Sequence, residues 1–257
     1  MQAVITAAGL GTRMLPVTKV IPKEMLPVLF KGEFKPIIHI VFEQLYTLGI
    51  RDFIIVVGRG KRTIEDYFTP DYNFVQYLES VGKVKQAQDL MGLYKKVEES
   101  SIAFVNQPEP KGFGDAVLRS KPFVHEDFMV VAPDTLLLSI PKMPINSITV
   151  TKVDDPRIYG VVTLEEGDMI KDIEEKPNVP KSNIAVMPYY HFDLEIFNAL
   201  ESIFPVHGEL QLTEGIRELL RRGKKFKVIF VEGSYDMGDL QKYIVSLKEF
   251  LSWNGAD

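Results

Sequence analysis

The sequence predicts an α/β protein built on a doubly wound mixed sheet. Over the first half of the chain, apolar runs of strand length alternate with amphipathic segments of helix length. The first run, residues 2–7 (QAVITA), is apolar on both faces, as in a buried parallel strand. After residue 140 the alternation gives way to four successive β-rich runs. We therefore expect helices on both faces of a parallel first half, followed by a β-rich second half.

The first sixty residues predict one strand–helix–strand unit. Residues 36–48 (PIIHIVFEQLYTL) are typical of a helix, because Pro36 suits a first helical position and Gly49 a stop. A single apolar stripe along this segment is formed by Ile37, Val41, Leu45 and Leu48. A second buried strand follows at 53–58 (FIIVVG). Two strands joined through one helix imply parallel pairing with a right-handed crossover.

The remaining segments continue these patterns. Further helices are expected from residue 61, over most of the charged insertion 72–99, and at 114–121, 193–203, 213–222 and 239–251. Further strands are expected at 102–106, 128–132, 147–153, 159–164, 169–176, 183–192 and 226–233. A ligand is expected at the carboxyl ends of the parallel strands, where open α/β sheets bind their ligands.

Composition excludes several classes of protein. The formal net charge of −5, from 30 basic and 35 acidic residues, argues against a general nucleic-acid binder. The absence of cysteine excludes disulfides, thiolate metal sites and a cysteine nucleophile. We see no targeting signal and no apolar stretch of membrane-spanning length, so we expect a cytoplasmic protein with no membrane partner.

A glycine-rich turn, GLGTR (9–13), follows the first strand. It is not a dinucleotide fingerprint, because Met14 stands where a third small residue is needed. It is not a P-loop either, because no Gly-Lys-Ser/Thr follows at the required spacing. Its glycines would still let backbone amides approach an anion closely. Taken alone, a tight strand-to-loop turn explains these glycines at least as well.

The residues after this turn favour an anion site. Arg13 can hold phosphate oxygens with two N–H groups, and Lys23 adds a point charge. Pro16 and Pro22 predict a shaped, extended loop between these cations in place of a helix.

Seven stretches of the chain resemble, in order, the signatures of sugar-1-phosphate nucleotidylyltransferases. They are GLGTRMLP with KEMLP in the opening loop, GRGKRTIEDYF (58–68), QPEPKGFGDAVL (107–118), YGVV (159–162), EEKP (174–177), GELQLTEGI (208–216) and YDMGD (235–239). The likeness implies the Rossmann-like nucleotide-diphospho-sugar transferase fold. It implies a single domain, 1–257, with a nucleotide-binding half (1–139) and a sugar-binding half with the C-terminal helix (140–257).

Within that family the chain resembles the branch that transfers a uridylyl group from UTP to glucose 1-phosphate, releasing pyrophosphate. The sugar phosphate would attack the α-phosphorus in line. A phosphomonoester is already largely ionised near pH 7, because its second pKa is about 6. The reaction therefore needs positioning and charge neutralisation, and no general base.

The resemblance assigns cations to the phosphates. Arg13 and the loop amides would hold the β- and γ-phosphates of the nucleotide, Lys23 would reach the reacting phosphates, and Lys176 in EEKP would hold the sugar phosphate. Without the family, a solvated lysine beside two acids is the simpler interpretation of Lys176.

Two aspartates are candidate ligands of Mg²⁺, which prefers carboxylates together with substrate phosphates and water. Asp134 follows the apolar strand 128–132, at a carboxyl end where ligands bind. Asp236 is expected in the turn after the strand 226–233. The alternative interpretation is an ordinary turn or capping aspartate at each position.

The remaining site residues also come from the resemblance. The nucleotide-binding set is Ala8, Gly9, Gly11, Thr12, Gln107, Gly112 and Asp115. The sugar-binding set is Gly160, Glu175 and Val186. An amide side chain such as that of Gln107 can donate and accept, so it can recognise an imide edge. A carboxylate such as Glu175 can accept from adjacent sugar hydroxyls.

Three departures from the family pattern leave specificity open. Asp115 stands where many relatives have histidine, Met187–Pro188 replaces a residue followed by glycine near the sugar, and Thr135 stands where a second acid is common. A thymidylyltransferase or a broad-specificity enzyme therefore remains an alternative. Similar proteins are commonly dimers or tetramers, so we expect a homo-oligomer.

Two other classes are also considered. A non-catalytic nucleotide-sugar sensor would have the same fold, but it could lose Asp134, Asp236 or Lys176, and this chain keeps all three. A Rossmann oxidoreductase is disfavoured by Met14 and because we expect no strand after Glu33, the acid about twenty residues past the glycines.

Overall fold

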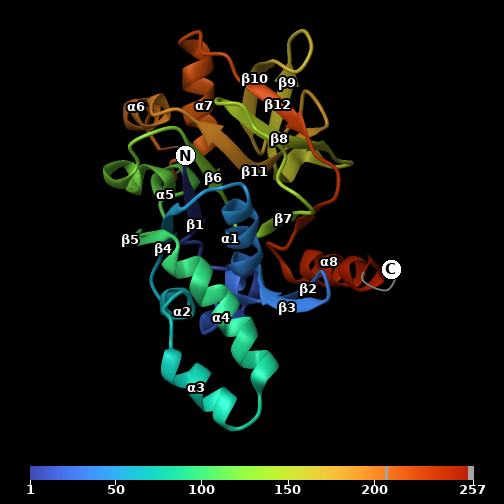
Figure 1. The fold of residues 1–257 in the computed structure, drawn as a ribbon. Helices are drawn as coiled ribbons and strands as arrows, with labels where there is room; N and C mark the ends of the chain where they lie inside the picture. The colour runs from blue at the N-terminus through green and yellow to red at the C-terminus, as the bar shows by residue number, and fades with distance from the viewer. Residues whose placement is uncertain (206–207, 254–257) are drawn as a thin grey trace.

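A central mixed sheet organises the molecule (Figure 1). We analysed a computed structural model, which describes residues 1–205 and 208–253. Four adjacent parallel strands run in the order β6 (Phe128–Val131), β1 (Gln2–Ala7), β4 (Asp52–Val57) and β5 (Ser101–Asn106). The predicted parallel first half is therefore confirmed.

The β-rich second half continues the same sheet. The long strand β11 (Ile184–Phe192) pairs antiparallel with β6 and so joins the two halves. The sheet is completed by β8 (Ser147–Lys152), β9 (Gly160–Leu164), β10 (Ile170–Glu175) and β12 (Lys227–Phe230). The predicted doubly wound mixed sheet is thus confirmed over the described part of the chain.

Strand β1 faces a hydrophobic core on each side of the sheet. Ala3, Ile5 and Ala7 pack in one core, with α1 (Ile37–Thr47), α4 (Val84–Glu98) and α8 (Leu240–Trp253). Val4 and Ala8 point to the other core, with α5 (Phe113–Arg119), α6 (Glu195–Ser202) and α7 (Leu212–Arg221). This alternation explains why the β1 sequence is apolar on both faces.

A hairpin outside the main sheet was not predicted. It consists of β2 (Pro27–Phe30) and β3 (Glu33–Pro36), joined by Lys31 and Gly32 with φ of 51° and 80°. Two positive φ values in a two-residue loop are typical of a tight antiparallel hairpin. The expectation that no strand follows Glu33 is therefore wrong. This strand is nevertheless antiparallel and separate from the main sheet, unlike the parallel strand that would carry the acid of a dinucleotide site.

The loop after β1 contains short 3₁₀ turns. They are η1 (Thr12–Met14), η2 (Val17–Lys19) and η3 (Lys23–Met25). No α-helix begins at the glycine turn, as predicted, but the loop is coiled where we expected extended backbone. Gly11 makes the first bend with a φ of 66°, and the Thr18 hydroxyl donates to its carbonyl at 2.7 Å. A Cβ at Gly11 would lie 3.0 Å from that of Thr18, so the bend needs glycine.

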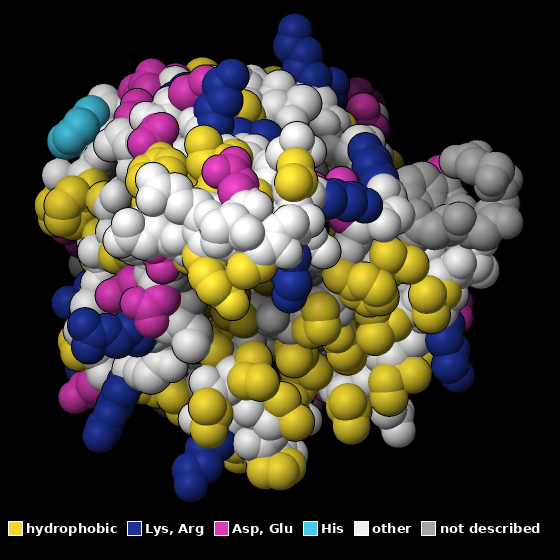
Figure 2. All heavy atoms as spheres, turned by 60° about the horizontal axis from the view of Figure 1, so that its bottom comes forward, with side chains coloured by type: hydrophobic (Ala, Val, Ile, Leu, Met, Phe, Trp, Pro, Cys, Tyr) yellow, Lys and Arg dark blue, Asp and Glu magenta, His cyan; other side chains and the backbone are white. Residues whose placement is uncertain are grey.

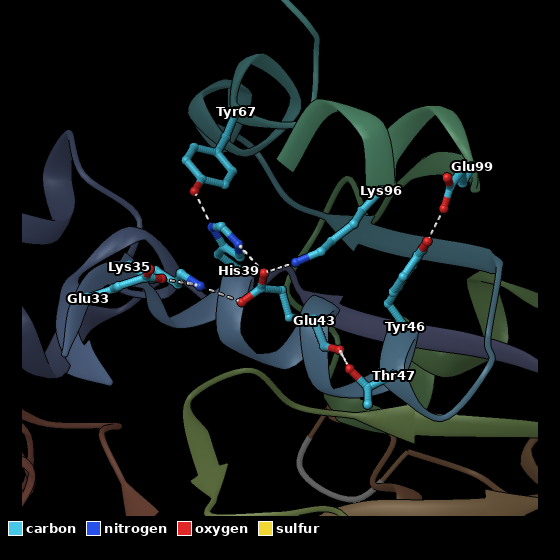
Figure 3. A network of polar contacts seen from close by, with 9 residues as sticks. All are labelled: Glu33, Lys35, His39, Glu43, Tyr46, Thr47, Tyr67, Lys96 and Glu99. Carbon is cyan, nitrogen blue, oxygen red and sulfur yellow. Dashed lines mark hydrogen bonds and ion pairs between the residues drawn. The ribbon is translucent and has the colours of Figure 1, made fainter. Parts of the chain in front are cut away.

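The helical insertion consists of α2 (Arg62–Tyr67), α3 (Tyr72–Ser80) and α4, and a polar network fastens it to α1 (Figure 3). His39 Nδ1 lies 2.6 Å from the Tyr67 hydroxyl. The carboxylate of Glu43 accepts a hydrogen bond from Lys35 Nζ, on the hairpin, at 2.8 Å. It also forms an ion pair with Lys96 Nζ, on α4. Burial opposes the charge of Glu43, but the hydrogen bonds of His39, Lys35 and Lys96 outweigh it and lower the pKa of this carboxyl. The network therefore joins hairpin, α1 and insertion.

The last helix closes the structure on the hairpin side. Helix α8 packs against β2 and against β13 (Ser234–Asp236), and the Tyr243 hydroxyl donates to the Pro27 carbonyl at 2.6 Å. None of the helices in residues 1–205 and 208–253 is both long and apolar enough to span a membrane.

Candidate functional site

The carboxyl ends of the parallel strands form one edge, as predicted. The register aligns Ala7, Val57 and Asn106 across β1, β4 and β5, so the next residues, Ala8, Gly58 and Gln107, are neighbours. The contact between the first two is close, since a Cβ at Gly58 would lie 2.7 Å from the Ala8 carbonyl oxygen.

The two candidate metal ligands lie together beside this edge. Thr135 in β7 (Thr135–Leu137) pairs with Asp236 in β13, and the Met237 amide donates to the Asp134 carbonyl at 2.7 Å. A Cβ at Gly238 would lie 3.0 Å from Asp236 Oδ1 and 3.6 Å from Asp134 Oδ2. Asp236 ends a strand, so its expected place in a turn is wrong. This three-residue strand depends on pairing with a segment about a hundred residues away, which no local pattern reveals.

Cations surround this acid pair. Lys23 Nζ lies 2.5 Å from Asp134 Oδ2, and Lys242 Nζ, on α8, lies 2.5 Å from Asp236 Oδ2. The same ammonium donates to the Tyr159 hydroxyl at 3.2 Å. Arg13 Nη2 would lie 3.6 Å from a Cβ at Gly238, so this exposed guanidinium borders the acids as well.

Sequence reasoning missed two members of this cluster. Lys242 is one basic residue on an amphipathic helix, and Tyr159 is one of ten tyrosines, so neither carries a local signal. The YGVV motif, which begins at Tyr159, was the available indication for the tyrosine.

The pair of Lys23 and Asp134 is held in the charged form. Burial works against the carboxylate of Asp134, but the charge and hydrogen bond of Lys23, together with Arg13, outweigh it and lower its pKa. Burial also works against the ammonium of Lys23, but Asp134 and Glu24 outweigh it and raise its pKa. The side chains are only 12% (Lys23) and 23% (Asp134) exposed, so few waters screen them.

A buried ion pair supports the turn that carries Lys23. Lys61 Nζ, from the loop after β4, donates to Glu24 Oε2 at 2.6 Å. The side chains are 7% and 1% exposed, respectively. Since Glu24 adjoins Lys23 in η3, the pair fixes the backbone from which Lys23 reaches Asp134.

The acid pair fits a magnesium ion in its chemistry. Mg²⁺ takes oxygen ligands and commonly uses one or two carboxylates, with phosphates and water completing its octahedron. Asp134 and Asp236 offer two such carboxylates close together. Within the described residues no group of three or more His, Cys, Asp or Glu side chains could hold a metal, so a dedicated protein cage is absent there. Two carboxylates would leave the remaining positions of the octahedron to phosphate and water.

The residues predicted to bind the nucleotide lie along this edge. Gln107 is 4% exposed, and its Nε2 lies 3.1 Å from the Gly112 carbonyl and 2.7 Å from Asp115 Oδ2. Gly112 has a φ of 100°, and a Cβ there would lie 2.4 Å from the Leu210 carbonyl oxygen. Thr12 lies in η1, and a Cβ at Gly9 would touch Lys23 Cε at 3.9 Å.

The predicted sugar-binding residues come together from three strands. A Cβ at Gly160 in β9 would lie 3.3 Å from Val186 Cγ2 in β11 and 3.5 Å from Glu175 Oε2 at the end of β10. Thr213, on α7, joins this cluster, because its hydroxyl donates to Glu175 Oε2 at 3.1 Å. Sequence reasoning did not single out Thr213, although it lies inside the GELQLTEGI motif.

Lys176 lies beside the sugar cluster. Its side chain is 60% exposed, and Nζ lies 3.4 Å from Glu175 Oε1. Its backbone has a φ of 41°, and its amide donates to the Tyr159 carbonyl at 3.0 Å. Tyr159 thus links the backbone of Lys176 to the Lys242–Asp236 pair, so the acid cluster and the sugar cluster are adjacent.

Comparison with protein families gives a match over nearly the whole chain. Residues 2–252 match the model described as "Nucleotidyl transferase". The chain is 36% identical to a UTP–glucose-1-phosphate uridylyltransferase of Streptococcus pneumoniae serotype 4, over 93% of this chain and 86% of that protein. It is 33% identical to a similarly named protein of Streptococcus pyogenes serotype M3, over 93% and 84%.

Solved structures agree with these relatives. A UDP-glucose pyrophosphorylase in complex with UDP-glucose has a TM-score of 0.81 and 31% identity, covering 98% of each chain. A UTP-bound UGPase from Acinetobacter baumannii has a TM-score of 0.83 and 29% identity, covering 97% of this chain and 92% of that one.

Proposed function

The chain belongs to the nucleotidyl transferase family, and we propose that it transfers the uridylyl group of UTP to glucose 1-phosphate, producing UDP-glucose and pyrophosphate. The observation that carries this proposal is the position of the acid–cation cluster. It lies between the strand ends that carry Ala8 and Gln107 and the sugar cluster around Gly160 and Glu175.

The chain's own residues suit a reaction between two polyanions. The sugar phosphate supplies an ionised nucleophile near pH 7, because its second pKa is about 6. Arg13, Lys23 and Lys242 supply positive charge where the triphosphate would lie, and Lys176 supplies it beside the sugar cluster. These residues would orient the nucleophile in line with the leaving pyrophosphate and neutralise the charge that gathers there.

Magnesium is part of the proposal. Asp134 and Asp236 would hold the ion together with the nucleotide phosphates, where it would neutralise phosphate charge. Lys23 and Lys242, which lie against these carboxylates, would contribute positive charge to the phosphate oxygens of the bound nucleotide.

Each half of the chain would bind one substrate. Residues 1–139 would bind the nucleotide through the glycine turn, Gln107 and Gly112, and residues 140–257 the sugar through Gly160, Glu175 and Val186. Residues 206–207 and 254–257 lie outside the described residues.

We propose in addition that the protein self-associates. Large apolar side chains are exposed on the opening loop, the hairpin and α8, among them Val20, Phe34 and Val245. Figure 2, which turns the bottom of Figure 1 toward the viewer, shows apolar side chains gathered over one part of the surface. Light scattering should give a mass above that of one chain, and Phe34→Glu or Val245→Glu should lower it. A monomeric wild-type protein would overturn this proposal.

The decisive experiment is a panel of UTP, dTTP, CTP and ATP against several sugar 1-phosphates, following pyrophosphate release with Mg²⁺ and with EDTA. UTP with glucose 1-phosphate should give the highest kcat/KM, and EDTA should abolish the reaction. Equal use of dTTP would indicate a thymidylyl or broad-specificity enzyme. Binding of UTP or UDP-glucose without any turnover would indicate a sensor.

A further inference from the structure

The amide of Gln107 has only one orientation that its surroundings permit. Its Nε2 lies 3.1 Å from the Gly112 carbonyl oxygen and 2.7 Å from Asp115 Oδ2. Backbone carbonyls and carboxylates accept hydrogen bonds, and an amide nitrogen has two hydrogens to donate. The reverse orientation would place Oε1 against two acceptors. Both N–H groups of Gln107 are therefore used inside the protein.

Asp115 is itself held in place for this contact. Arg119, one turn later on α5, donates from Nη2 to Asp115 Oδ1 at 3.2 Å and from Nε to Oδ2 at 3.5 Å. The side chain of Asp115 is 11% exposed, whereas that of Arg119 is 42% exposed. Arg119 thus turns Asp115 toward Gln107.

The other end of the amide remains available. Within the described residues no hydrogen bond reaches Gln107 Oε1. Among the described residues, the buried side-chain nitrogen and oxygen atoms that lack a hydrogen-bond partner do not include this oxygen, so solvent reaches it. A solvent-reached carbonyl oxygen at the end of β5 can only accept, so it selects a ligand with an N–H group.

We propose that Asp115 is a positioning residue that makes this protein select bases with an N–H at the ring position facing Gln107. Uracil and thymine carry such an N3–H, whereas cytosine presents a lone pair at the same position. The inference rests on the proposed function, in which Gln107 meets the base. It explains why an acid at position 115 is compatible with uracil recognition.

The test compares affinities for UMP and CMP by calorimetry, which needs neither turnover nor magnesium. In the wild type, UMP should bind at least about 10-fold more tightly than CMP. With CMP bound, Gln107 Oε1 would face the lone pair of cytosine N3 and would have no hydrogen to accept. Asp115→Leu removes the shorter of the two contacts that fix the Gln107 amide and leaves only the one to the Gly112 carbonyl, so the amide should turn over more readily and the UMP-to-CMP affinity ratio should fall by about 10-fold. If that variant lacks a cooperative unfolding transition, Asp115→Ser, too short to reach Gln107, should show the same fall.

Two matched variants separate positioning from general structure. Asp115→Asn keeps an oxygen that accepts from Gln107, since the exposed Arg119 can turn into solvent, and should keep most of the wild-type ratio. Glu218→Met removes a similar acid–arginine pair one turn apart, Glu218 with Arg222 on α7, and should leave the ratio unchanged.

Different results would overturn the positioning role of Asp115 and the proposed uridylyl transfer. An unchanged affinity ratio in Asp115→Leu and Asp115→Ser would overturn the positioning role even if the wild type makes UDP-glucose. A wild type that binds CMP as tightly as UMP would overturn it as well. A wild type that fails to release pyrophosphate from UTP and glucose 1-phosphate would instead overturn the proposed function.

Discussion

The ammonium of Lys23 lies 2.5 Å from the carboxylate of Asp134, although 111 residues separate them in the chain. The contact connects the loop after β1 with the acid after β6, and these two strands are neighbours in the sheet. Each charge stabilises the other against burial, since the pKa of Asp134 is lowered and that of Lys23 is raised. The loop after β1 and the candidate metal ligand therefore form one unit.

Asp134→Asn should nearly abolish turnover and leave the fold intact. Asparagine has the shape of the carboxylate but lacks its charge, so it is a poor ligand for magnesium and a poor partner for Lys23. We expect pyrophosphate release to fall by about 10³-fold or more, as for the loss of several kcal/mol of transition-state stabilisation. Asp155→Asn, at an exposed ion pair with Arg157, serves as the control with wild-type activity. Undiminished release by Asp134→Asn in Mg²⁺ would contradict the metal role.

Lys176→Ala should impair the use of glucose 1-phosphate more than the binding of UTP. The exposed ammonium lies 3.4 Å from Glu175 Oε1, in the sugar cluster. We expect KM for the sugar phosphate to rise about 10- to 100-fold, as for the loss of a hydrogen bond to a charged group. Lys181→Ala removes a similarly exposed lysine, paired with Asp172, and should change neither value. Calorimetry showing that UTP affinity collapses, with the sugar phosphate unaffected, would mean that Lys176 serves the nucleotide.

The contribution of Glu43 to stability should disappear in acid. Glutamate in an unfolded chain has a pKa of about 4.3, and folding lowers the pKa of Glu43. Glu43 therefore contributes its full stabilisation when the pH is above its pKa in the unfolded chain. This stabilisation is lost as the pH falls through its pKa in the folded protein. The loss of unfolding free energy caused by Glu43→Gln should shrink as the pH falls below about 4.3, as measured by urea denaturation. If the loss of unfolding free energy in Glu43→Gln instead grew as the pH fell below about 4.3, the Glu43 carboxylate would not be the stabilising group.

Periodicity and composition predict helices with one apolar stripe and strands that are buried on both faces, because these patterns lie within one continuous segment of the sequence. The strand at Gln2–Ala7 and the helix at Ile37–Thr47 agree with their predicted ranges to within a residue or so. The pairing of β7 with β13 was invisible, because strands of three residues are stabilised by their partner and carry no alternation of their own.

The candidate site shows the same division. Asp134 could be named in advance because it follows a buried strand at its carboxyl end, and Gly160 because it lies in the YGVV motif. Lys242 could not be named, because its role depends on where α8 packs after the chain has folded. The partner of Gln107 was also hidden, since sequence spacing cannot show that Asp115 turns toward it.

The Glu24–Lys61 pair should behave as one unit in stability. Removing one member leaves a buried charge without a partner, so Glu24→Leu or Lys61→Met alone should cost about 3–5 kcal/mol of unfolding free energy. The double variant should recover much of that loss, because no lone charge remains buried. Its turnover should nevertheless stay below wild type, because the backbone that carries Lys23 loses its support.

The exposed pair of Asp155 and Arg157 provides the matched comparison for this double-mutant cycle. Its side chains are 52% and 65% exposed, so water and salt screen the charges, and the coupling energy should be within about 1 kcal/mol. For Glu24 and Lys61 the coupling should be several times larger, since both charges are out of water. Additive effects of Glu24→Leu and Lys61→Met would show that the two side chains stabilise the turn separately. In that case the position of Lys23 against Asp134 would depend on the 3₁₀ turn alone.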